Sequence, residues 1–582
     1  MELQEQRRIS GSGPKSLILA VIVLFLLGGL IARLSYLQLW EGPVYRERAE
    51  KNRIRPWYRA PVRGELQDRK GRVLASRRQV YALYLEPADN AKADWPRVLT
   101  TLSPHVGLSV AEMQKLLDRA GYRSAFPVRI RQDLDPKLIT FIKENQAQFP
   151  GVEVVVDTVR HYPYGPIAAH IIGYTGEISE KELARRKEAG QNYRPGDLVG
   201  KNGVERLFEE ELHGEGGGEL REVNAAGQKI RDLGKIEPKP GKTITLTLDI
   251  ELQKVAENAL GTRRGAVVVV DVRTGEILVM ASHPGFDPNL FSRPITRTEW
   301  QAIQGLDHPF LNRAVRPYAP ASTFKIVVTA AALESGLYRA DTRLGTYGSY
   351  RVGSRSFGEH NHRGWGVIGF ERALTVSADT FFYQVGLKLG PERIAEMSRR
   401  FGFGTRTALE LPSESPGLAP DEAWKKRVYR DRWRAGDTAN YAIGQGYSLV
   451  TPLQNALMMA AIANGGDLVA PRLKKGEPVA RRPLGLSPQT LAVIRRGSRG
   501  VTLPGGTAYR ALGGASQVPN AGKTGTAEDA NSSRTNAVFV GYAPFDKPEI
   551  AVSVLVEQGG HGGSDAAPIA AQIYGLYFAK KP

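Results

Sequence analysis

The sequence predicts an α+β protein carried by one N-terminal transmembrane helix. Three features indicate this: an uncharged apolar run at residues 16–32, mixed short strands, turns and helices at 41–244, and apolar strand runs at both ends of the mainly helical stretch 245–582. A chain of 582 residues is long enough for several domains, and 42% hydrophobic with 24% charged residues is an ordinary globular composition.

The N-terminal apolar stretch has the length of a membrane-spanning helix. The run 16–32 covers roughly 25 Å at 1.5 Å per residue, and residues 34–40 continue it after Arg33. Small residues are not placed as a signal-peptide cleavage site, so we expect an uncleaved anchor over residues 16–40. We place residues 1–15 in the cytoplasm and the bulk of the chain outside, because long domains translocate largely regardless of charge.

The chain is strongly basic, with a formal net charge of +19, and it has no Cys. The basic residues are spread along the chain without a nucleic-acid-binding motif. We therefore expect a membrane-surface setting, with anionic phospholipids or a diphosphate-linked lipid nearby, and no nucleic-acid partner. The absence of Cys excludes disulfides and thiolate zinc sites.

Residues 41–244 show no catalytic constellation, and we interpret them as a pedestal. Residues 81–86 alternate like a strand, while Ser109 and Glu112 form a capping box that opens an amphipathic helix. The stretch from about 88 to 150 is therefore predicted to be a helical insertion within the pedestal.

The second domain is predicted over residues 245–582. Residues 265–270 and 277–281 predict a hairpin of buried strands, and further strand runs occur at 537–540 and 550–556, before a final helix. Strands at both ends with helices between them indicate an α+β domain.

A Ser and a Lys stand three positions apart at Ser322 and Lys325. Residues 324–333 predict a helix, and positions three apart share a helix face. The Lys325 amine is therefore expected beside the Ser322 hydroxyl at the first turn, where free backbone N–H groups favour a developing oxyanion. The same spacing at Ser12 and Lys15 lies beside Gly and Pro in a loose tail. The alternative is that Ser322 is only a helix N-cap.

Three short fragments, far apart but in one order, resemble the motif set of class A β-lactamases and penicillin-binding proteins. They are Ser322-Thr323-Phe324-Lys325, Ser377-Ala378-Asp379 and Lys523-Thr524-Gly525-Thr526. Further stretches over nearly the whole chain are similar to the class B penicillin-binding proteins, and within them to the cell-elongation subfamily. Those stretches are Arg63-Gly64-Glu65-Leu66, residues 200–205, Leu246-Thr247-Leu248-Asp249, Ile443-Gly444-Gln445-Gly446, Thr451-Pro452-Leu453-Gln454 and Val540-Gly541-Tyr542-Ala543-Pro544.

This resemblance implies both a fold and an activity. The fold is an elongated α/β pedestal followed by a penicillin-binding transpeptidase domain with a central antiparallel sheet flanked by helices. The activity is D,D-transpeptidation, in which Ser322 attacks the penultimate D-Ala carbonyl of a stem peptide and a neighbouring amine resolves the acyl-enzyme. β-Lactams would acylate the same Ser, and no cofactor is implied.

The resemblance also assigns roles to the fragments. Ser322 is the expected nucleophile and Lys325 the candidate base, because an amine crowded by Lys523 in a low-dielectric cleft loses its proton more readily. Ser377 is expected to relay a proton to the leaving or attacking amine. Asp379 stands where Asn is commoner, and a carboxylate near Lys325 favours its charged form, so the identity of the base stays open.

The third fragment is expected to bind the substrate. Lys523, Thr524 and Thr526 would hold the substrate carboxylate, and the backbone N–H groups of Ser322 and Thr526 resemble the oxyanion hole of the family. Lys523-Thr524-Gly525 is predicted to lie on a strand just before the run 537–542. Gly525 has no side chain, so an extended peptide can lie close against that strand.

Two His and a carboxylate, His360, His362 and Glu359, precede the second fragment in a Gly-rich segment. They suggest a metal site, but the segment has no HExxH motif and no predicted helix. We therefore expect an exposed loop and no metal.

Several alternatives stay open. The chain could be a division-specific transpeptidase, a non-catalytic scaffold, a β-lactam sensor, or a β-lactamase-like hydrolase. D,D-carboxypeptidase activity differs only in that water resolves the acyl-enzyme.

The resemblance implies partners and a location. We expect a SEDS-family glycosyltransferase to contact the transmembrane helix, with Arg33 facing it, and the pedestal. Scaffold proteins of the elongation complex and peptidoglycan stem peptides are the other expected partners. The expected location is the bacterial inner membrane, with one membrane pass and the catalytic domain on the periplasmic or extracellular side.

Overall fold

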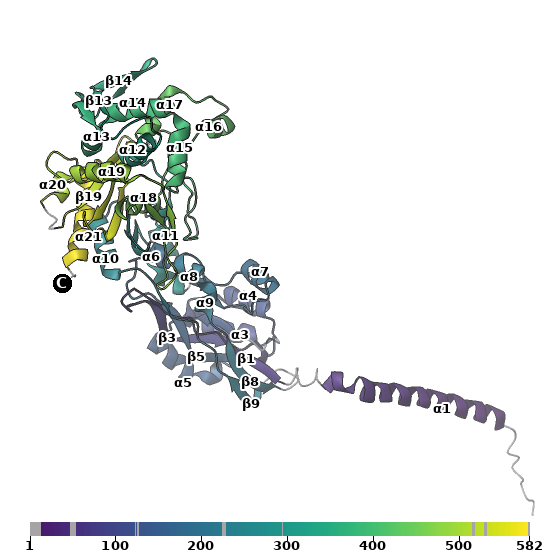
Figure 1. The fold of residues 1–582 in the computed structure, drawn as a ribbon. Coiled ribbons are helices and arrows are strands. Elements are labelled where there is room, and N and C mark those ends of the chain that lie inside the picture. The colour runs from purple at the N-terminus through teal and green to yellow at the C-terminus, as the bar shows by residue number, and fades with distance from the viewer. Residues whose placement is uncertain are drawn as a thin grey trace, which may run out of the picture. The chain divides into compact units, whose positions relative to one another are not determined.

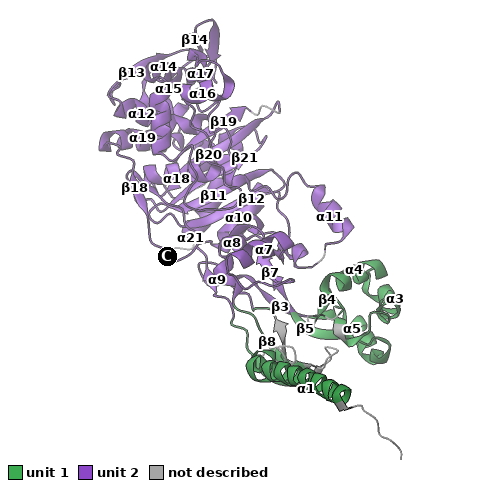
Figure 2. Cartoon of the chain, turned by 90° about the vertical axis from the view of Figure 1, so that its right-hand side faces the viewer, with its two compact units in different colours: residues 1–61, 81–157, 215–239 green, residues 62–80, 158–214, 240–582 purple. Residues whose placement is uncertain are grey.

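The computed structural model describes most of the chain and is drawn as a ribbon in Figure 1. Packing divides the chain into two compact units, shown in different colours in Figure 2. Unit 1 comprises residues 1–61, 81–157 and 215–239, and unit 2 comprises residues 62–80, 158–214 and 240–582. The predicted domain division at residue 244/245 stays a prediction. The described residues are 13–46, 54–122, 124, 127–223, 229–293, 295–514, 518–528 and 532–579.

One long apolar helix opens the described part of the chain. α1 spans Gly13–Ser35, and a π-helical turn continues it over Tyr36–Trp40. Its apolar side chains are exposed on all faces, and Phe25 is 82% exposed. A helix that is apolar on all faces is typical of a segment surrounded by the lipid chains of a membrane. Among the described residues, Pro14–Trp40 is the one helix long and apolar enough to cross a membrane, with a mean hydropathy of 2.8.

Besides α1, the described residues of unit 1 form short strands and three further α-helices. Its elements are β1 (Ile54–Arg59), β4 (Val128–Arg131), β8 (Gly217–Val223), β9 (Lys229–Ile236), α3 (Trp95–Val106), α4 (Val110–Ala120) and α5 (Pro136–Glu144). The predicted capping box opens α4: the Ser109 hydroxyl accepts the Glu112 N–H at 3.2 Å, and the Glu112 carboxylate accepts the Ser109 N–H at 2.8 Å. The helices pack around buried side chains such as Trp95 and Leu99. The described residues within 88–150 thus form three α-helices and one strand, β4.

Buried charges join two segments of unit 2, residues 62–80 and 158–214. Glu205 is fully buried, and its two carboxylate oxygens accept the Nε–H groups of Arg63 and Arg160, each at 2.7 Å. A buried carboxylate is tolerated where it is paired and hydrogen-bonded in this way. Gly64 lies so close to the neighbouring backbone that a Cβ would meet the Lys242 carbonyl oxygen at 2.0 Å. The family-like stretches 63–66 and 200–205 therefore contact each other through the Arg63–Glu205 pair and have a packing role in unit 2.

The centre of unit 2 is a five-stranded antiparallel sheet. In spatial order its strands are β12 (Ile277–His283), β11 (Gly265–Asp271), β21 (Ile550–Val556), β20 (Thr535–Ala543) and β19 (Ala521–Glu528). β11 and β12 form the predicted hairpin. Val267 and Val269 face one core, whereas Val268 and Val270 face the other. Because both faces are buried, these strands are continuously apolar instead of alternating.

Helices cover both faces of this sheet (Figure 1). They are α18 (Pro452–Ala463) on one face, and α10 (Ile250–Leu260) and α21 (Ala567–Ala579) on the other. α18 is buried along its whole length. The predicted α+β class, with a central antiparallel sheet flanked by helices, is confirmed.

The stretch between β12 and β19 is mainly helical, as predicted, and it supplies most of the site. Its elements near the site are a 3-10 turn (Ala321–Phe324), α12 (Lys325–Glu334), β14 (Ser349–Val352), β15 (Arg355–Gly358), α13 (Phe370–Val376), α14 (Asp379–Leu389) and α17 (Ala435–Ala442). α12 begins at Lys325, one residue after the start that the sequence predicts at Phe324.

Candidate active site

Ser322 lies in the 3-10 turn just ahead of α12. The Ala321 N–H of this turn donates to the Gly444 carbonyl at 2.9 Å, which ties the turn to the family-like stretch at 443–446. The other three residues of the turn are buried, and Ser322 alone is partly exposed. The turn therefore presents the predicted nucleophile while its neighbours anchor the backbone.

β19, which carries the third fragment, runs against this turn. A Cβ at Gly525 would lie 3.1 Å from the Ala321 Cβ and 3.2 Å from the Pro320 carbonyl oxygen. The missing side chain thus allows the strand to approach the Ser322 turn closely. The predicted role of Gly525 in binding an extended peptide stays a prediction, and the structure adds this packing role.

Lys325 is fully buried, and its amine contacts three oxygens. Nζ lies 2.6 Å from Asp379 Oδ1, 2.8 Å from the Ser377 carbonyl oxygen and 3.3 Å from Ser377 Oγ. The Phe382 ring lies below it, with its centroid 5.5 Å from Nζ. An ammonium group has three hydrogens, which matches these three acceptors. The first two fragments therefore meet around one amine.

Lys523 is also fully buried, but no carboxylate contacts its amine among the described residues. Nζ lies 2.8 Å from Ser377 Oγ and 2.9 Å from the Thr524 carbonyl oxygen. Burial lowers the pKa of Lys523 well below its ordinary value, the Lys325 charge lowers it further, and Asp379 opposes the change. The Ser377 hydroxyl therefore lies between two buried amines that differ in their electrostatic environment.

Ser377 sits in an unusual backbone conformation. It ends α13 with φ of 60°, in the left-handed region that residues other than glycine seldom adopt. The chain turns here, and α14 starts at Asp379. This turn directs the Ser377 carbonyl and hydroxyl, together with the Asp379 carboxylate, toward Lys325.

Two more residues complete the surroundings of the third fragment. The Gln445 amide donates to the Thr526 carbonyl at 3.4 Å, and the Thr524 and Thr507 hydroxyls share a hydrogen bond of 2.7 Å. Sequence reasoning placed Gln445 in a family-like stretch without a role and did not single out Thr507. Neither belongs to a catalytic motif, and only the fold brings them to β19.

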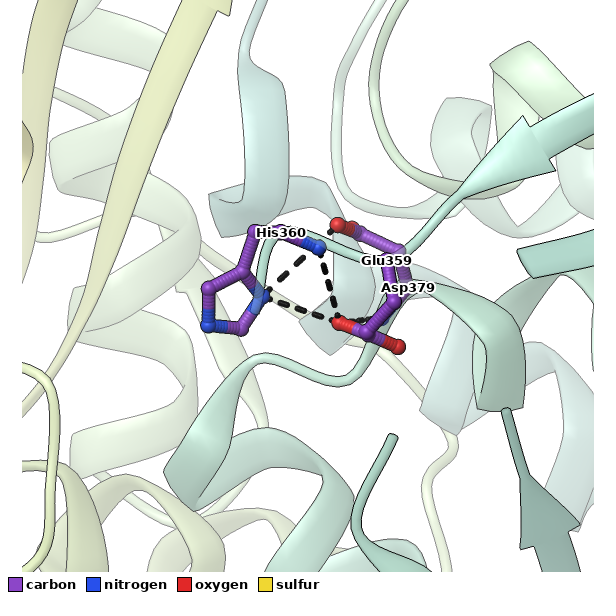
Figure 3. Close-up of side chains that lie close together, drawn as sticks. All are labelled: Glu359, His360 and Asp379. Atoms are coloured by element: carbon purple, nitrogen blue, oxygen red, sulfur yellow. Dashed lines mark hydrogen bonds and ion pairs between the residues drawn. The ribbon is translucent and has the colours of Figure 1, made fainter. Parts of the chain in front are cut away.

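Glu359 has a structural role in the site that the sequence interpretation, which weighed it only as a metal ligand, missed. The prediction of an exposed loop is wrong for this residue, which is only 1% exposed. Its carboxylate accepts the backbone N–H groups of Asp379 and Thr380 at 3.0 and 2.9 Å, and it lies 2.9 Å from His360 Nδ1. Figure 3 shows Glu359, His360 and Asp379 converging. His360 and His362 lie at the surface, as expected.

The same three side chains offer metal-ligating atoms within 4.8 Å of one another. Both Glu359 oxygens, however, already accept hydrogen bonds from N–H or O–H donors of Asp379 and Thr380. His360 Nδ1 faces a carboxylate oxygen, which can only accept, so this nitrogen carries its hydrogen. A cation here would have to displace these bonds, and the expectation of no metal stays a prediction.

Replacing Asp379 with asparagine should preserve acylation of Ser322. The amide oxygen of Asn can still accept a hydrogen bond from Lys325, whereas the negative charge is lost. Since Asp379 raises the pKa of Lys523, its removal lowers that pKa, and a neutral amine persists to lower pH. The rate of labelling by a fluorescent penicillin, measured from pH 5 to 9, should fall toward acid pH as the amine becomes protonated. We expect this fall, the acid limb of the pH–rate profile, to move to lower pH in the variant. Complete loss of labelling would show that Asp379 is required as an acid.

Two family models match the chain. One, described as the penicillin binding protein transpeptidase domain, matches residues 265–575. The other, described as the penicillin-binding protein dimerisation domain, matches residues 58–246. Together they cover both the pedestal and the region that holds the clustered fragments.

Known proteins resemble the chain over nearly its full length. The peptidoglycan D,D-transpeptidase MrdA of Acinetobacter baumannii is 34% identical, over 98% of this chain and 88% of the relative. The solved structure of penicillin-binding protein PBP2 from Helicobacter pylori, in a complex with MreC, has a TM-score of 0.80 at 28% identity and covers 91% of this chain and 99% of its own. A structure described as coordinating polymerization and crosslinking in a peptidoglycan synthase complex has a TM-score of 0.72 at 31% identity, covering 98% of this chain and 99% of its own.

Proposed function

This chain belongs to the class B penicillin-binding proteins, and from that premise we propose that it is a peptidoglycan D,D-transpeptidase of bacterial cell-wall elongation. One observation carries the proposal: the Ser377 hydroxyl lies between the buried amines of Lys325 and Lys523, beside the turn that presents Ser322. A hydroxyl nucleophile needs a nearby base, and a cluster of two amines with one carboxylate can supply one.

The first half of the reaction forms the acyl-enzyme. Ser322 Oγ attacks the carbonyl carbon of the penultimate D-Ala, and its proton passes to a neutral amine of the cluster, with Ser377 as the relay. The developing oxyanion is held by the backbone N–H groups of Ser322 and Thr526. The C–N bond then breaks, and the leaving D-Ala nitrogen takes a proton from the cluster.

The second half transfers the acyl group. An amine of a neighbouring stem peptide attacks the ester carbonyl, gives up a proton to the cluster, and releases Ser322 Oγ with its hydrogen restored. A β-lactam enters the first half only, because its ring opens on Ser322 and no leaving group departs. Thr524 and Thr526 would bind the substrate carboxylate, with Lys523 beside them.

Two amines compete for the role of proton acceptor. Lys325 forms an ion pair with the Asp379 carboxylate at 2.6 Å. Lys523 has no carboxylate contact among the described residues, and burial lowers its pKa. We therefore assign the neutral amine to Lys523, whereas the sequence suggested Lys325. Protons in such a coupled pair belong to the cluster, so Lys325 takes part in each transfer.

The N-terminal helix and the similar structures support membrane and assembly partners. α1 would anchor the enzyme by one pass in the inner membrane, with the catalytic region outside. We propose a SEDS-family glycosyltransferase as the partner of this helix, with Arg33 facing it, and of the pedestal, and a scaffold protein of the elongation complex as a second partner. The complexes of the similar proteins, one with MreC and one described as a peptidoglycan synthase complex, support this assembly.

The activity is tested with the purified full-length protein in lipid nanodiscs. We expect it to release D-Ala from a donor peptide that ends in D-Ala-D-Ala and to join the donor to an amine-bearing acceptor peptide. Benzylpenicillin should stop both reactions. Hydrolysed donor without joined product would point to a carboxypeptidase, and folded protein that releases no D-Ala from any stem-peptide donor would contradict the proposal.

A further inference from the structure

We propose that Glu359 is a positioning residue for acyl transfer: its buried carboxylate caps α14 from a separate hairpin and thereby fixes the Ser377–Asp379 turn against Lys325. The inference rests on the proposed function, because it concerns the same site. Glu359 acts by holding the backbone of the Ser377–Asp379 turn, so it is not itself a catalytic residue.

α14 begins without a capping side chain of its own. Its N-cap position is Ala378, which has no side-chain oxygen and makes no capping bond. Glu359 supplies the missing acceptor, because Oε1 accepts the Asp379 N–H at 3.0 Å and Oε2 accepts the Thr380 N–H at 2.9 Å. These are backbone donors that every helix start leaves without an intrahelical partner. The cap that a local Ser or Asp would provide thus comes from elsewhere in the fold.

The hairpin that carries Glu359 is anchored on the same helix. Glu359 follows β15, and its N–H donates to the Gly348 carbonyl at 2.9 Å. The ring of Phe357, on β15, packs against Tyr383 of α14 with centroids 5.4 Å apart, and the Tyr383 hydroxyl donates to the Gly358 carbonyl at 3.3 Å. The carboxylate therefore reaches the helix start from a backbone that is itself packed on α14.

Glu359 is negatively charged at neutral pH. Burial favours its neutral form, but hydrogen bonds from His360 and from the Thr380 and Asp379 N–H groups, together with the Lys325 charge, hold its pKa at about 2. A negative charge is favoured at the positive end of a helix dipole. The titratable groups that face it are His360 beside it in the chain, Asp379 and Tyr383 on α14, and Lys325 on α12.

The cap determines where the catalytic groups stand. Because Glu359 holds the Asp379 N–H, the Asp379 side chain extends from a fixed backbone, and its Oδ1 meets Lys325 Nζ at 2.6 Å. Its Oδ2 lies 3.9 Å from His360 Nδ1 on the solvent side. Ser377, two residues earlier, keeps its left-handed conformation next to this capped start. Without the cap the first turn of α14 can unwind, and the contacts of both residues with the amines are lost.

The test compares Glu359→Gln and Glu359→Asp with the wild type, using labelling by a fluorescent penicillin. Gln offers one acceptor oxygen and turns an NH2 group toward backbone donors, so the second-order labelling rate at pH 7 should fall by about 10- to 100-fold. The negative charge of Glu359 interacts with the Lys325 charge, so Gln removes an interaction that favours protonation of the amine cluster, and the acid limb of the pH–rate profile should move to lower pH. Asp keeps the negative charge, but its side chain is one methylene shorter and cannot contact both N–H groups. It should therefore lower the labelling rate and leave the acid limb in place.

Glu371→Gln is the matched control. Glu371 lies on α13 shortly before Ser377, and its exposed carboxylate pairs with Arg496 at 2.7 Å, so wild-type labelling is expected. A Glu359→Gln protein with a lowered melting temperature but wild-type rate and acid limb would make Glu359 merely structural and overturn the proposal. If that variant does not fold, Glu359→Asp decides: a wild-type rate overturns the proposal and a reduced rate supports it. Failure of the wild type to label would instead contradict the proposed function.

Discussion

Replacing Ser322 with alanine abolishes covalent labelling by penicillin and release of D-Ala, while the protein remains folded. The reason is chemical: alanine lacks the hydroxyl that forms the ester, so the loss is complete for labelling, and turnover should fall by a factor on the order of 10⁶. The Ser322 side chain is partly exposed in a turn anchored by its buried neighbours, so the loss of one hydroxyl should leave the melting temperature nearly unchanged. The measurement is gel fluorescence after labelling, together with thermal unfolding.

The matched control for this variant is Ser12→Ala. Ser12 has the same spacing to a Lys, Lys15, but it lies outside the described residues and outside the three fragments. Labelling of Ser12→Ala should equal that of the wild type. Persistent labelling of folded Ser322→Ala would assign the nucleophile to another residue.

Replacing Lys523 with arginine lowers the acylation rate by about 10²- to 10⁴-fold, which is the contribution typical of a general base. Arginine keeps a positive charge but does not lose its proton in proteins, so it can hold a carboxylate and cannot accept the Ser322 proton. If Lys523 acts only as a cation, the arginine variant should retain most of the labelling. The rate of penicillin labelling as a function of pH is the measurement.

The same assignment fixes the sign of the pH dependence. Burial lowers the pKa of Lys523, so its neutral form persists to a lower pH than that of an ordinary lysine. As the pH falls through that pKa, the amine becomes protonated and the wild-type labelling rate drops. Lys523→Met, which has no amine, should be as slow as the arginine variant and show no such limb. Lys388→Met, a change on the exposed side of α14, should behave as wild type.

Local patterns in the sequence predicted the elements of the fold well. The capping box at Ser109 opens α4, the turn between the apolar runs joins β11 to β12, and Lys523 lies on the strand that precedes β20, all as expected. These features depend on neighbours within a few residues. The pairing of β11 with β21, which lies near the other end of the chain, brings the two ends of the catalytic domain together. The family resemblance implied a central antiparallel sheet, but neither it nor the local patterns specified that these two strands pair.

The meeting of the three fragments could be predicted from the sequence, whereas the electrostatic environment of their amines could not. Fragment order predicted Ser322, Lys325, Ser377 and Lys523, and the fold brings their fragments together. Spacing could not show which amine receives the carboxylate contact, because that depends on how the Ser377 turn folds. Nor could it show Glu359 as a cap, since the acceptor lies about twenty residues from the N–H groups that it binds. A helix whose N-cap is Ala378 was the available signal, because it needs an acceptor from elsewhere.

The most direct test is the identity of the residue that carries the acyl group. The full-length protein is incubated with isotopically labelled penicillin, digested, and analysed by peptide mass spectrometry. We expect one adduct, on the peptide that contains Ser322 and on the Ser322 side chain within it. An adduct on any other residue, or no adduct on folded protein, would contradict the assignment of Ser322 as the nucleophile.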